Sequence, residues 1–172
     1  MAGSTGEGAT VFVLDEGFDL DHPDLELNTD LAESFACWSF DEEGEVQTDW
    51  DNCEPVQYLF DDDYASHGTH TAGTIGAEDN LIGVIGVAPD AEIVPVKVLS
   101  EDLGYGFSSW IMTGIVYAAN NGADVINMSL GGQWFQGIGP DSSAAAAWRT
   151  AYNRAVTYAY KQGVTVVVSA GN

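Results

Sequence analysis

The chain has 172 residues, of which 45% are hydrophobic, and its 27 Asp and Glu against 4 Lys and Arg give a formal net charge of −23. A chain of this length and hydrophobicity predicts one domain with a sizeable core. No apolar run is long enough for a membrane-spanning helix, no basic segment begins a secretory signal, and the negative charge excludes binding to nucleic acid or anionic membranes, whose phosphates it would repel.

Strand and helix patterns alternate along the chain. Four short apolar runs predict buried strands at residues 10–14, 92–99, 124–130 and 164–169. Two longer stretches predict helices, one over residues 108–120 and an alanine-rich one that Asp141 or Ser142 caps and that runs to residue 160. This alternation predicts an α/β fold, in which helices cover both faces of a mainly parallel sheet. In such sheets the functional residues gather at the carboxyl ends of the strands.

The acidic residues are concentrated in the first part of the chain. Residues 1–96 hold 23 of the acids and neither Lys nor Arg, whereas residues 97–172 hold four acids and all four bases. Two interpretations of this excess remain open. One is a solvated acidic face of the kind found in proteins of high-salt organisms, and the other is a set of oxygen-rich sites for divalent cations.

Two residues that follow predicted strands or polar loops are candidates for proton-transfer chemistry. Asp15 directly follows the first predicted strand, and His67 opens the segment HGTHTAGTI. A His that acts as a general base needs a carboxylate to hold its tautomer and to stabilise the imidazolium. On residue type alone, a turn or helix-cap role for Asp15 and a structural role for His67 remain open.

Five segments, taken in order, resemble those of the subtilisin-like serine peptidases. VFVLDEGFDLDHPDL resembles the surroundings of that family's catalytic Asp, SHGTHTAGTI those of its catalytic His, and GVIGVAPDAEIVPVKVL the strand that follows. GADVINMSLGG resembles the substrate-binding strand, and VVVSAGN the approach to the oxyanion-hole Asn. The resemblance covers residues from about 8 to 172, except about 34–64, and implies a three-layer αβα fold with a mainly parallel central sheet.

The resemblance assigns catalytic roles to three residues. Asp15 matches the carboxylate that orients the general base, His67 the general base itself, and Asn172 the side-chain donor of the oxyanion hole. The family's reactive Ser lies downstream of that Asn in a Gly-Thr-Ser-Met-Ala type motif, and no serine of this chain stands in such a context. Residues 1–172 therefore resemble the N-terminal part of a catalytic domain, which we expect to be inactive alone. Glu16 departs from the family, which usually has a small hydroxyl residue there.

The resemblance also implies a substrate site between two strands, where an extended peptide adds backbone hydrogen bonds. The matching residues are Gly104, Tyr105 and Gly106 in one segment and Ser129, Leu130, Gly131 and Gly132 in the other. Glycine suits both segments because it lets a peptide backbone approach closely. The open alternative is that Gly104 and Gly106 are ordinary loop glycines.

A structural calcium site follows from the same resemblance. Family members bind calcium with the loop after the His helix and with the carboxylate of the HPDL motif. The matching residues are Asp24, Glu78, Asn80, Ile82 and Val84. Side-chain oxygens of Asp24 and Asn80, with the carbonyl oxygens of the other three, suit a hard cation that prefers six to eight oxygens. A helix cap or turn is the alternative role for Asp24.

Residues from about 34 to 63 form an acidic insertion relative to most of the family. Cys37 and Cys53 lie 16 residues apart in it. In an exported protein this spacing suggests a disulfide, worth about 3 kcal/mol by chain-entropy arithmetic. A thiolate metal site is the alternative, although neither His22 nor His70 has ligand spacing to the cysteines. The acids of the insertion either are solvated or bind a second calcium ion.

The sequence and the resemblance predict a secreted, calcium-stabilised serine endopeptidase domain that acts on polypeptides. A propeptide is expected to inhibit the precursor, any export signal is expected to precede this chain, and the complete protein is expected to be a monomer. Two other classes stay open: an inactive peptide-binding pseudoprotease, and an acidic structural domain adapted to calcium or salt. A cytosolic α/β hydrolase is excluded because the chain has no GxSxG motif.

Overall fold

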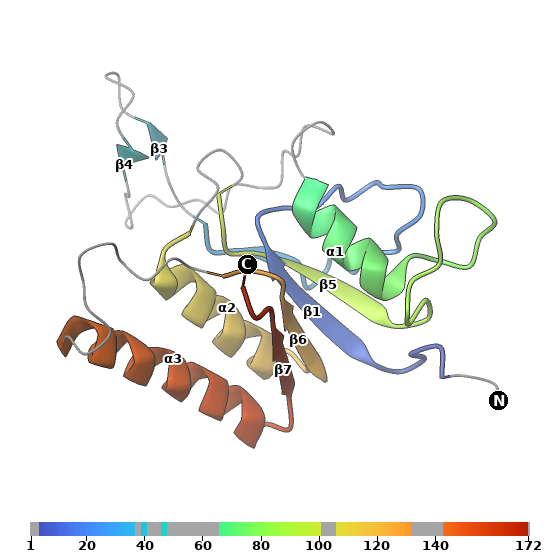
Figure 1. Cartoon of the computed structure of the whole chain (residues 1–172). Coiled ribbons are helices and arrows are strands. Elements are labelled where there is room, and N and C mark those ends of the chain that lie inside the picture. The colour runs from blue at the N-terminus through green and yellow to red at the C-terminus, as the bar shows by residue number, and fades with distance from the viewer. Residues whose placement is uncertain are drawn as a thin grey trace.

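The computed structural model of the chain describes residues 4–36, 39–40, 46–47, 66–100, 106–131 and 143–171. Within these residues, five strands form one sheet in the order β2-β5-β1-β6-β7, and its pairings are all parallel. One helix, α1, covers one face of the sheet, and α2 and α3 cover the other (Figure 1). The three-layer α/β fold with a mainly parallel sheet is therefore confirmed.

Four of the five sheet strands and two of the three helices in the described residues lie close to the positions that the sequence patterns predict. The strands of the sheet are β1 Thr10–Asp15, β2 Glu33–Ser34, β5 Glu92–Lys97, β6 Val125–Met128 and β7 Thr165–Val168. The helices are α1 Ser66–Gly76, α2 Ser108–Asn120 and α3 Ser143–Lys161. A separate antiparallel pair, β3 Ser39–Phe40 and β4 Val46–Gln47, lies in the acidic insertion. None of the helices in the described part of the chain has the length and hydropathy that a membrane crossing needs.

The side chains of β1 alternate between two cores. Phe12 and Leu14 are fully buried in the core that β1 shares with α2 and α3, whereas Val11 and Val13 belong to the core on the α1 side. Successive residues of a strand point to opposite faces. Asp15, two residues after Val13, is therefore directed to the side of the sheet that α1 covers.

The neighbouring strand β5 follows the same alternation. Ile93 packs in the core on the α1 side, and Val94 and Val96 pack in the opposite core. Lys97, the next residue after Val96, consequently faces α1. Because the parallel register pairs Asp15 with Lys97, two oppositely charged side chains end neighbouring strands on the same face.

Helix α1 contacts the sheet through its smallest residues. Gly68, Ala72 and Gly76 are buried and recur every fourth residue, which places them on one face of the helix. A methyl group on Gly76 would lie 2.7 Å from Cγ1 of Ile93 in β5. The helix backbone therefore lies close to the strands, and its first turn lies close to their carboxyl ends.

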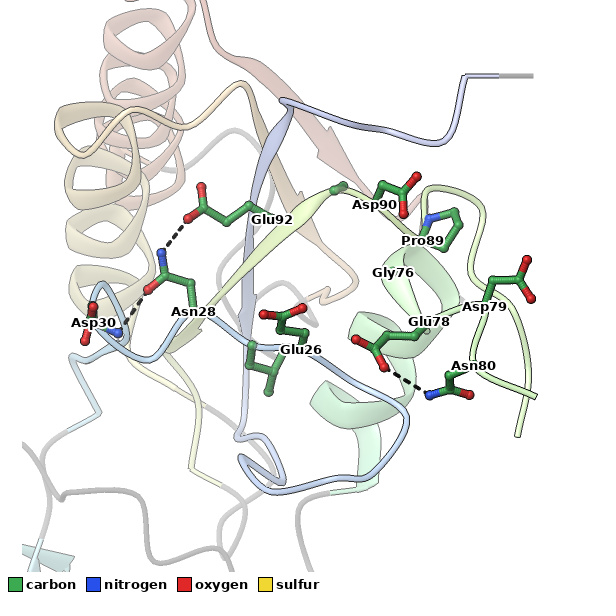
Figure 2. A pocket seen from close by; sticks show the side chains of 12 residues that line it. Glu26, Asn28, Asp30, Gly76, Glu78, Asp79, Asn80, Pro89, Asp90 and Glu92 are labelled. Carbon is green, nitrogen blue, oxygen red and sulfur yellow. Dashed lines mark hydrogen bonds between the residues drawn. The ribbon is translucent and has the colours of Figure 1, made fainter. Parts of the chain in front are cut away.

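An acidic cavity of about 740 Å³ lies beside the last residue of α1 and the first residue of β5 (Figure 2). The carboxylates in its lining belong to Glu26, Asp30, Glu78, Asp79, Asp90 and Glu92. Two of them accept hydrogen bonds from amide side chains, Glu78 from Asn80 and Glu92 from Asn28. Because the strands are parallel, this cavity lies at the opposite edge of the sheet from Asp15, the last residue of β1.

Candidate active site

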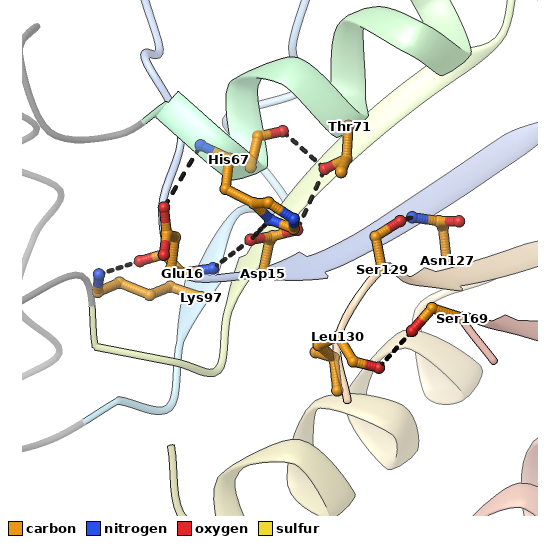
Figure 3. A network of polar contacts seen from close by, with 10 residues as sticks. Asp15, Glu16, His67, Thr71, Lys97, Asn127, Ser129, Leu130 and Ser169 are labelled. Atoms are coloured by element: carbon orange, nitrogen blue, oxygen red, sulfur yellow. Dashed lines mark hydrogen bonds and ion pairs between the residues drawn. The ribbon is translucent and has the colours of Figure 1, made fainter. Parts of the chain in front are cut away.

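The carboxylate of Asp15 and the imidazole of His67 are in direct hydrogen-bond contact (Figure 3). Nδ1 of His67 lies 2.8 Å from Oδ1 of Asp15. The side chain of Asp15 is fully buried, whereas that of His67, in the first turn of α1, is 50% exposed. A carboxylate only accepts hydrogen bonds, so Nδ1 donates and Nε2 keeps its lone pair. The pair can therefore take up a proton at Nε2 while Asp15 holds the ring.

Further donors hold the buried carboxylate of Asp15 in this orientation. The backbone N–H of Glu16 donates to Oδ1 at 2.8 Å, and the hydroxyl of Thr71 lies 3.1 Å from Oδ2. The same hydroxyl lies 2.9 Å from the carbonyl oxygen of Gly68, so its single proton serves one acceptor at a time. Thr71 was not among the predicted site residues. Its position four residues after His67, on the same helix face, was the available signal.

Glu16 and Lys97 connect the ends of β1 and β5 to the first turn of α1. Oε1 of Glu16 accepts a hydrogen bond from the backbone N–H of His67 at 3.3 Å. The buried ammonium of Lys97 donates to the backbone carbonyl of Glu16. Lys97 was not among the predicted site residues. Its place beside Asp15 depends on the strand register, for which the sequence has no local signal.

The surroundings of His67 favour its protonated form. The hydrogen bond with Asp15 is the largest cause that raises the pKa of His67 above the usual 6.5, and burial partly opposes it. The negative charges of Asp15 and Glu16 add to the increase. A general base must be neutral before it accepts a proton. The imidazole is therefore available as a base at pH values above this raised pKa.

The segments that follow β6 and β7 meet at the same edge of the sheet. Oγ of Ser169 donates to the carbonyl oxygen of Leu130 at 2.8 Å (Figure 3). Oγ of Ser129 accepts a hydrogen bond at 3.0 Å from Nδ2 of Asn127 in β6. A methyl group on Gly131 would lie 3.9 Å from Cα of Gly171. Two of the predicted substrate-binding residues, Leu130 and Gly131, therefore adjoin the segment that leads from β7 toward position 172.

Some predicted site residues cannot be placed in this way. Gly104, Tyr105, Gly132, Asn172, Cys37 and Cys53 lie outside the described residues. Gly106 is described, and a methyl group on it would lie 2.3 Å from the carbonyl oxygen of Val98. The backbone at Gly106 thus runs directly against the segment after β5, which a side chain at this position would prevent.

The predicted calcium ligands gather around Asp24. Oδ2 of Asp24 accepts a hydrogen bond from the N–H of Val84 at 3.0 Å, and its carbonyl oxygen accepts one from the N–H of Glu78 at 3.1 Å. Nδ2 of Asn80 donates to the Glu78 carboxylate at 3.0 Å, and its Oδ1 accepts from the N–H of Ile82 at 3.1 Å. The loop after α1 therefore folds onto the HPDL motif, and all five predicted ligands lie in one region.

Oδ1 of Asp24 fits a bound cation. Asp24 is 4% exposed, and this buried oxygen has no hydrogen-bond partner among the described residues. A buried carboxylate oxygen without a partner is costly, and a cation would offset that cost. In the part of the chain that the structure describes, no three acidic, His or Cys side chains gather as a metal cluster. The ligands would therefore be Asp24, the amide oxygen of Asn80 and backbone carbonyls, which Ca²⁺ accepts.

Comparisons with known proteins agree on one family. The sequence model of the subtilase family matches residues 6–172. Subtilisin E of Bacillus subtilis (strain 168) is 40% identical over 170 residues, which are 99% of this chain and 36% of the relative. An intracellular serine protease of Paenibacillus polymyxa is 43% identical over 127 residues, 74% of this chain and 34% of the relative. A crystal structure of a lanthipeptide protease superposes with a TM-score of 0.69 at 33% identity, over 98% of this chain and 41% of that one. This chain thus spans about a third of the length of these curated relatives.

Proposed function

The chain belongs to the subtilase family, as its motifs predicted, and on this premise we propose that the complete protein is a serine endopeptidase. The observation that carries the proposal is the 2.8 Å contact between Nδ1 of His67 and Oδ1 of Asp15. It leaves Nε2 of a half-exposed imidazole ready to accept a proton at the carboxyl end of β1. Parallel sheets commonly bind substrates at this edge.

In the proposed reaction His67 is the general base. A serine hydroxyl attacks the carbonyl carbon of the peptide bond while its proton passes to Nε2 of His67, and Asp15 stabilises the resulting imidazolium. The tetrahedral intermediate expels the amine, to which His67 returns the proton, and an acyl-enzyme remains. Water then attacks the acyl group with the same imidazole as base, which releases the carboxylic acid and restores the serine.

We propose that the nucleophilic serine lies downstream of this chain in the complete protein. No serine of the chain stands in a Gly-Thr-Ser-Met-Ala type motif, and the relatives are longer than this chain. Asn172 is the proposed side-chain donor to the oxyanion. In subtilisin the loss of such a donor costs about 10²–10³-fold in turnover. Without the downstream part, the chain would have the base and its orienting carboxylate but nothing to acylate.

Polypeptides are the proposed substrates. An extended peptide would pair with the backbone of Ser129, Leu130 and Gly131 after β6, as in other cases of strand addition. The hydrogen bond from Ser169 to Leu130 supports this role because it holds the segment in place beside the end of β7. We also propose that a propeptide occupies the same peptide-binding site before maturation. The complete protein is proposed to be a monomer.

Calcium is the proposed structural cofactor. Asp24 would contribute Oδ1, Asn80 its amide oxygen, and Glu78, Ile82 and Val84 their carbonyl oxygens. The buried Oδ1 of Asp24, for which the described part of the chain provides no hydrogen-bond partner, supports this assignment. The ion would supply positive charge that holds the loop after α1 against the HPDL motif, and a ligand that binds only the folded state stabilises that state.

Secretion is also a proposal, and family membership alone does not decide it. Two relatives, from Paenibacillus polymyxa and Bacillus subtilis (strain 168), are named as intracellular serine proteases. A disulfide between Cys37 and Cys53 would support secretion, because disulfides persist mainly in oxidising compartments.

The test is to express the complete reading frame and treat the protein with a serine-directed fluorophosphonate probe, with and without a chelator. We expect one serine to be labelled and the labelling to disappear in His67→Ala. His70→Ala, which removes an exposed imidazole one turn further along α1, is the matched control and should label normally. A complete protein that never labels, or a His67→Ala variant that still labels, would contradict the proposal and favour a peptide-binding pseudoprotease.

A further inference from the structure

Glu16 lies at the junction of β1, β5 and α1 and uses its backbone N–H, its carbonyl and its carboxylate there (Figure 3). The N–H donates to Oδ1 of Asp15 at 2.8 Å, and the carbonyl accepts from the ammonium of Lys97. Oε1 of the carboxylate accepts from the backbone N–H of His67 at 3.3 Å. A single residue thus contacts both members of the Asp15–His67 pair.

The contact with His67 lies where a helix needs an acceptor. Helix α1 begins at Ser66, so the N–H of His67 is among the first four, which have no acceptor within the helix. The first turn of α1 has no acidic residue of its own. The carboxylate of Glu16 therefore provides, from outside the helix, the acceptor and the negative charge that usually stabilise a helix N-terminus.

We propose that Glu16 is a positioning residue for His67. Its carboxylate caps the helix that carries the imidazole and places a second negative charge beside the Asp15–His67 pair. The proposal rests on the proposed function only in naming His67 as the general base. The contacts of Glu16 are features of the fold and are present whether or not the complete protein cleaves peptides.

The charged groups around His67 determine the sign of the electrostatic effect. Asp15 contacts the ring and Glu16 the backbone N–H of His67, both from the end of β1. Asp19, farther along the same loop, donates its backbone N–H to the hydroxyl of Thr69 in α1. Lys97 comes from the end of β5, and its ammonium is bound to the carbonyl of Glu16. The charge of Glu16 is one of the causes that raise the pKa of His67. Its removal should therefore lower that pKa, so that the base becomes neutral at lower pH.

Two substitutions separate the charge of Glu16 from its hydrogen bond. Glu16→Gln removes the charge but keeps an oxygen that can accept from the N–H of His67, whereas Glu16→Ala removes both. The matched controls are Glu7→Gln and Glu7→Ala. Glu7 is exposed and precedes the amino end of β1, so these variants make the same chemical change at the opposite edge of the sheet.

The experiment uses the complete protein with ¹³C-labelled histidine. An NMR titration gives the pKa of His67, whose signal is identified by its loss in His67→Ala, and amide hydrogen exchange reports on the first turn of α1. We expect Glu16→Gln to lower the pKa of His67 while the amides of that turn stay protected. We expect Glu16→Ala to lower the pKa and also to speed exchange. The pKa difference should shrink between about 0.1 M and about 1 M salt, because the Debye length falls from about 10 Å to about 3 Å.

The proposal is overturned if both Glu16 variants titrate and exchange like the Glu7 controls. Should Glu16→Ala fail to fold, Glu16→Gln still decides the electrostatic part, and an unchanged pKa in it would contradict the proposal. Neither readout needs a nucleophile or turnover. A protein that titrates as expected but never reacts with a fluorophosphonate would therefore contradict the proposed function and leave the role of Glu16 intact.

Discussion

A methyl group on Gly68 would lie 1.8 Å from the carbonyl oxygen of Gly17, so the first turn of α1 and the loop after β1 are in backbone contact. The same methyl group would lie 3.2 Å from Cβ of Asp15. Gly68 follows His67 directly. The 2.8 Å contact between the imidazole and the carboxylate therefore depends on an approach that only glycine permits at this position.

Gly68→Ala should separate the helix from the loop and weaken both folding and catalysis. Overpacking of this kind costs about 1–3 kcal/mol, and a shift of the helix would also move His67 away from Asp15. Urea unfolding and peptide hydrolysis by the complete protein measure the two effects. The control is Gly73→Ala in the same helix, where the nearest atom, Cδ2 of Leu25, would be 3.8 Å from the new methyl group.

The control should leave activity unchanged and stabilise the helix by up to about 1 kcal/mol, because alanine is a better helix former than glycine. A Gly68→Ala variant that is as stable and as active as Gly73→Ala would show that the backbone contact is unimportant.

Asp15→Asn should reduce turnover by about 10⁴-fold while the fold is retained. Asn is nearly the same size as Asp, but it carries no charge to stabilise the imidazolium and can present an amide donor that favours the wrong tautomer of His67. Initial rates with a chromogenic peptide provide the measurement. Asp21→Asn, at an exposed position on the following loop, should act like the wild type. A loss of less than about tenfold in Asp15→Asn would argue against the assigned role.

The contact between Asp15 and His67 should stabilise the fold more at low pH than at high pH. The folded-state pKa of His67 is raised above 6.5, chiefly by its hydrogen bond with Asp15, so protonation favours the folded state. This contribution is fully present below the unfolded-state pKa and is lost as the pH rises through the folded-state pKa. The measurement is the free energy of unfolding of the wild type and of His67→Gln at about pH 5.5 and at about pH 9. The difference between the two proteins at each pH shows whether this contribution falls as the pH rises.

That difference should be larger at the lower pH. Groups far from His67 titrate equally in both proteins and cancel in the subtraction. A difference that grows with pH would mean that the imidazolium is not stabilised in the folded protein.

Removal of calcium should lower the stability of the wild type but not that of Asp24→Ala. Binding at a free concentration of about 100 times Kd adds about 2.7 kcal/mol, which a chelator would abolish. Thermal unfolding with added calcium or with chelator is the measurement, and Asp21→Ala, three residues earlier and exposed, is the control. If the chelator leaves the melting temperature of the wild type unchanged, no structural calcium is bound there.

Cys37 and Cys53 should form a disulfide in the protein purified from an oxidising compartment. Intact mass before and after reduction would then differ by two hydrogens, and a peptide map would show the two cysteines linked. The loop that they close predicts a loss of about 3 kcal/mol in stability for the double variant Cys37→Ser and Cys53→Ser. Two free thiols in that protein would contradict the pairing.

The agreement between sequence and structure is best where a pattern extends over several residues. The helix predicted over residues 108–120 is observed with those ends, and β1 extends the predicted strand by one residue. β2 has only two residues, Glu33 and Ser34, and its pairing with β5 comes from the sheet rather than from any periodicity of its own. Helix α1 is rich in glycine and threonine, so the family resemblance implied it while propensity did not.

Local sequence was enough to predict the family, the order of the main strands and helices, and the candidate residues Asp15 and His67. The reason is that motifs and periodicity are properties of neighbouring residues. The contact of Glu16 with a backbone N–H 51 residues later became visible only in three dimensions. So did the place of Lys97 beside it. Such contacts depend on the register of β1 against β5 and on how closely the glycine face of α1 packs, and no local stretch of sequence encodes either one.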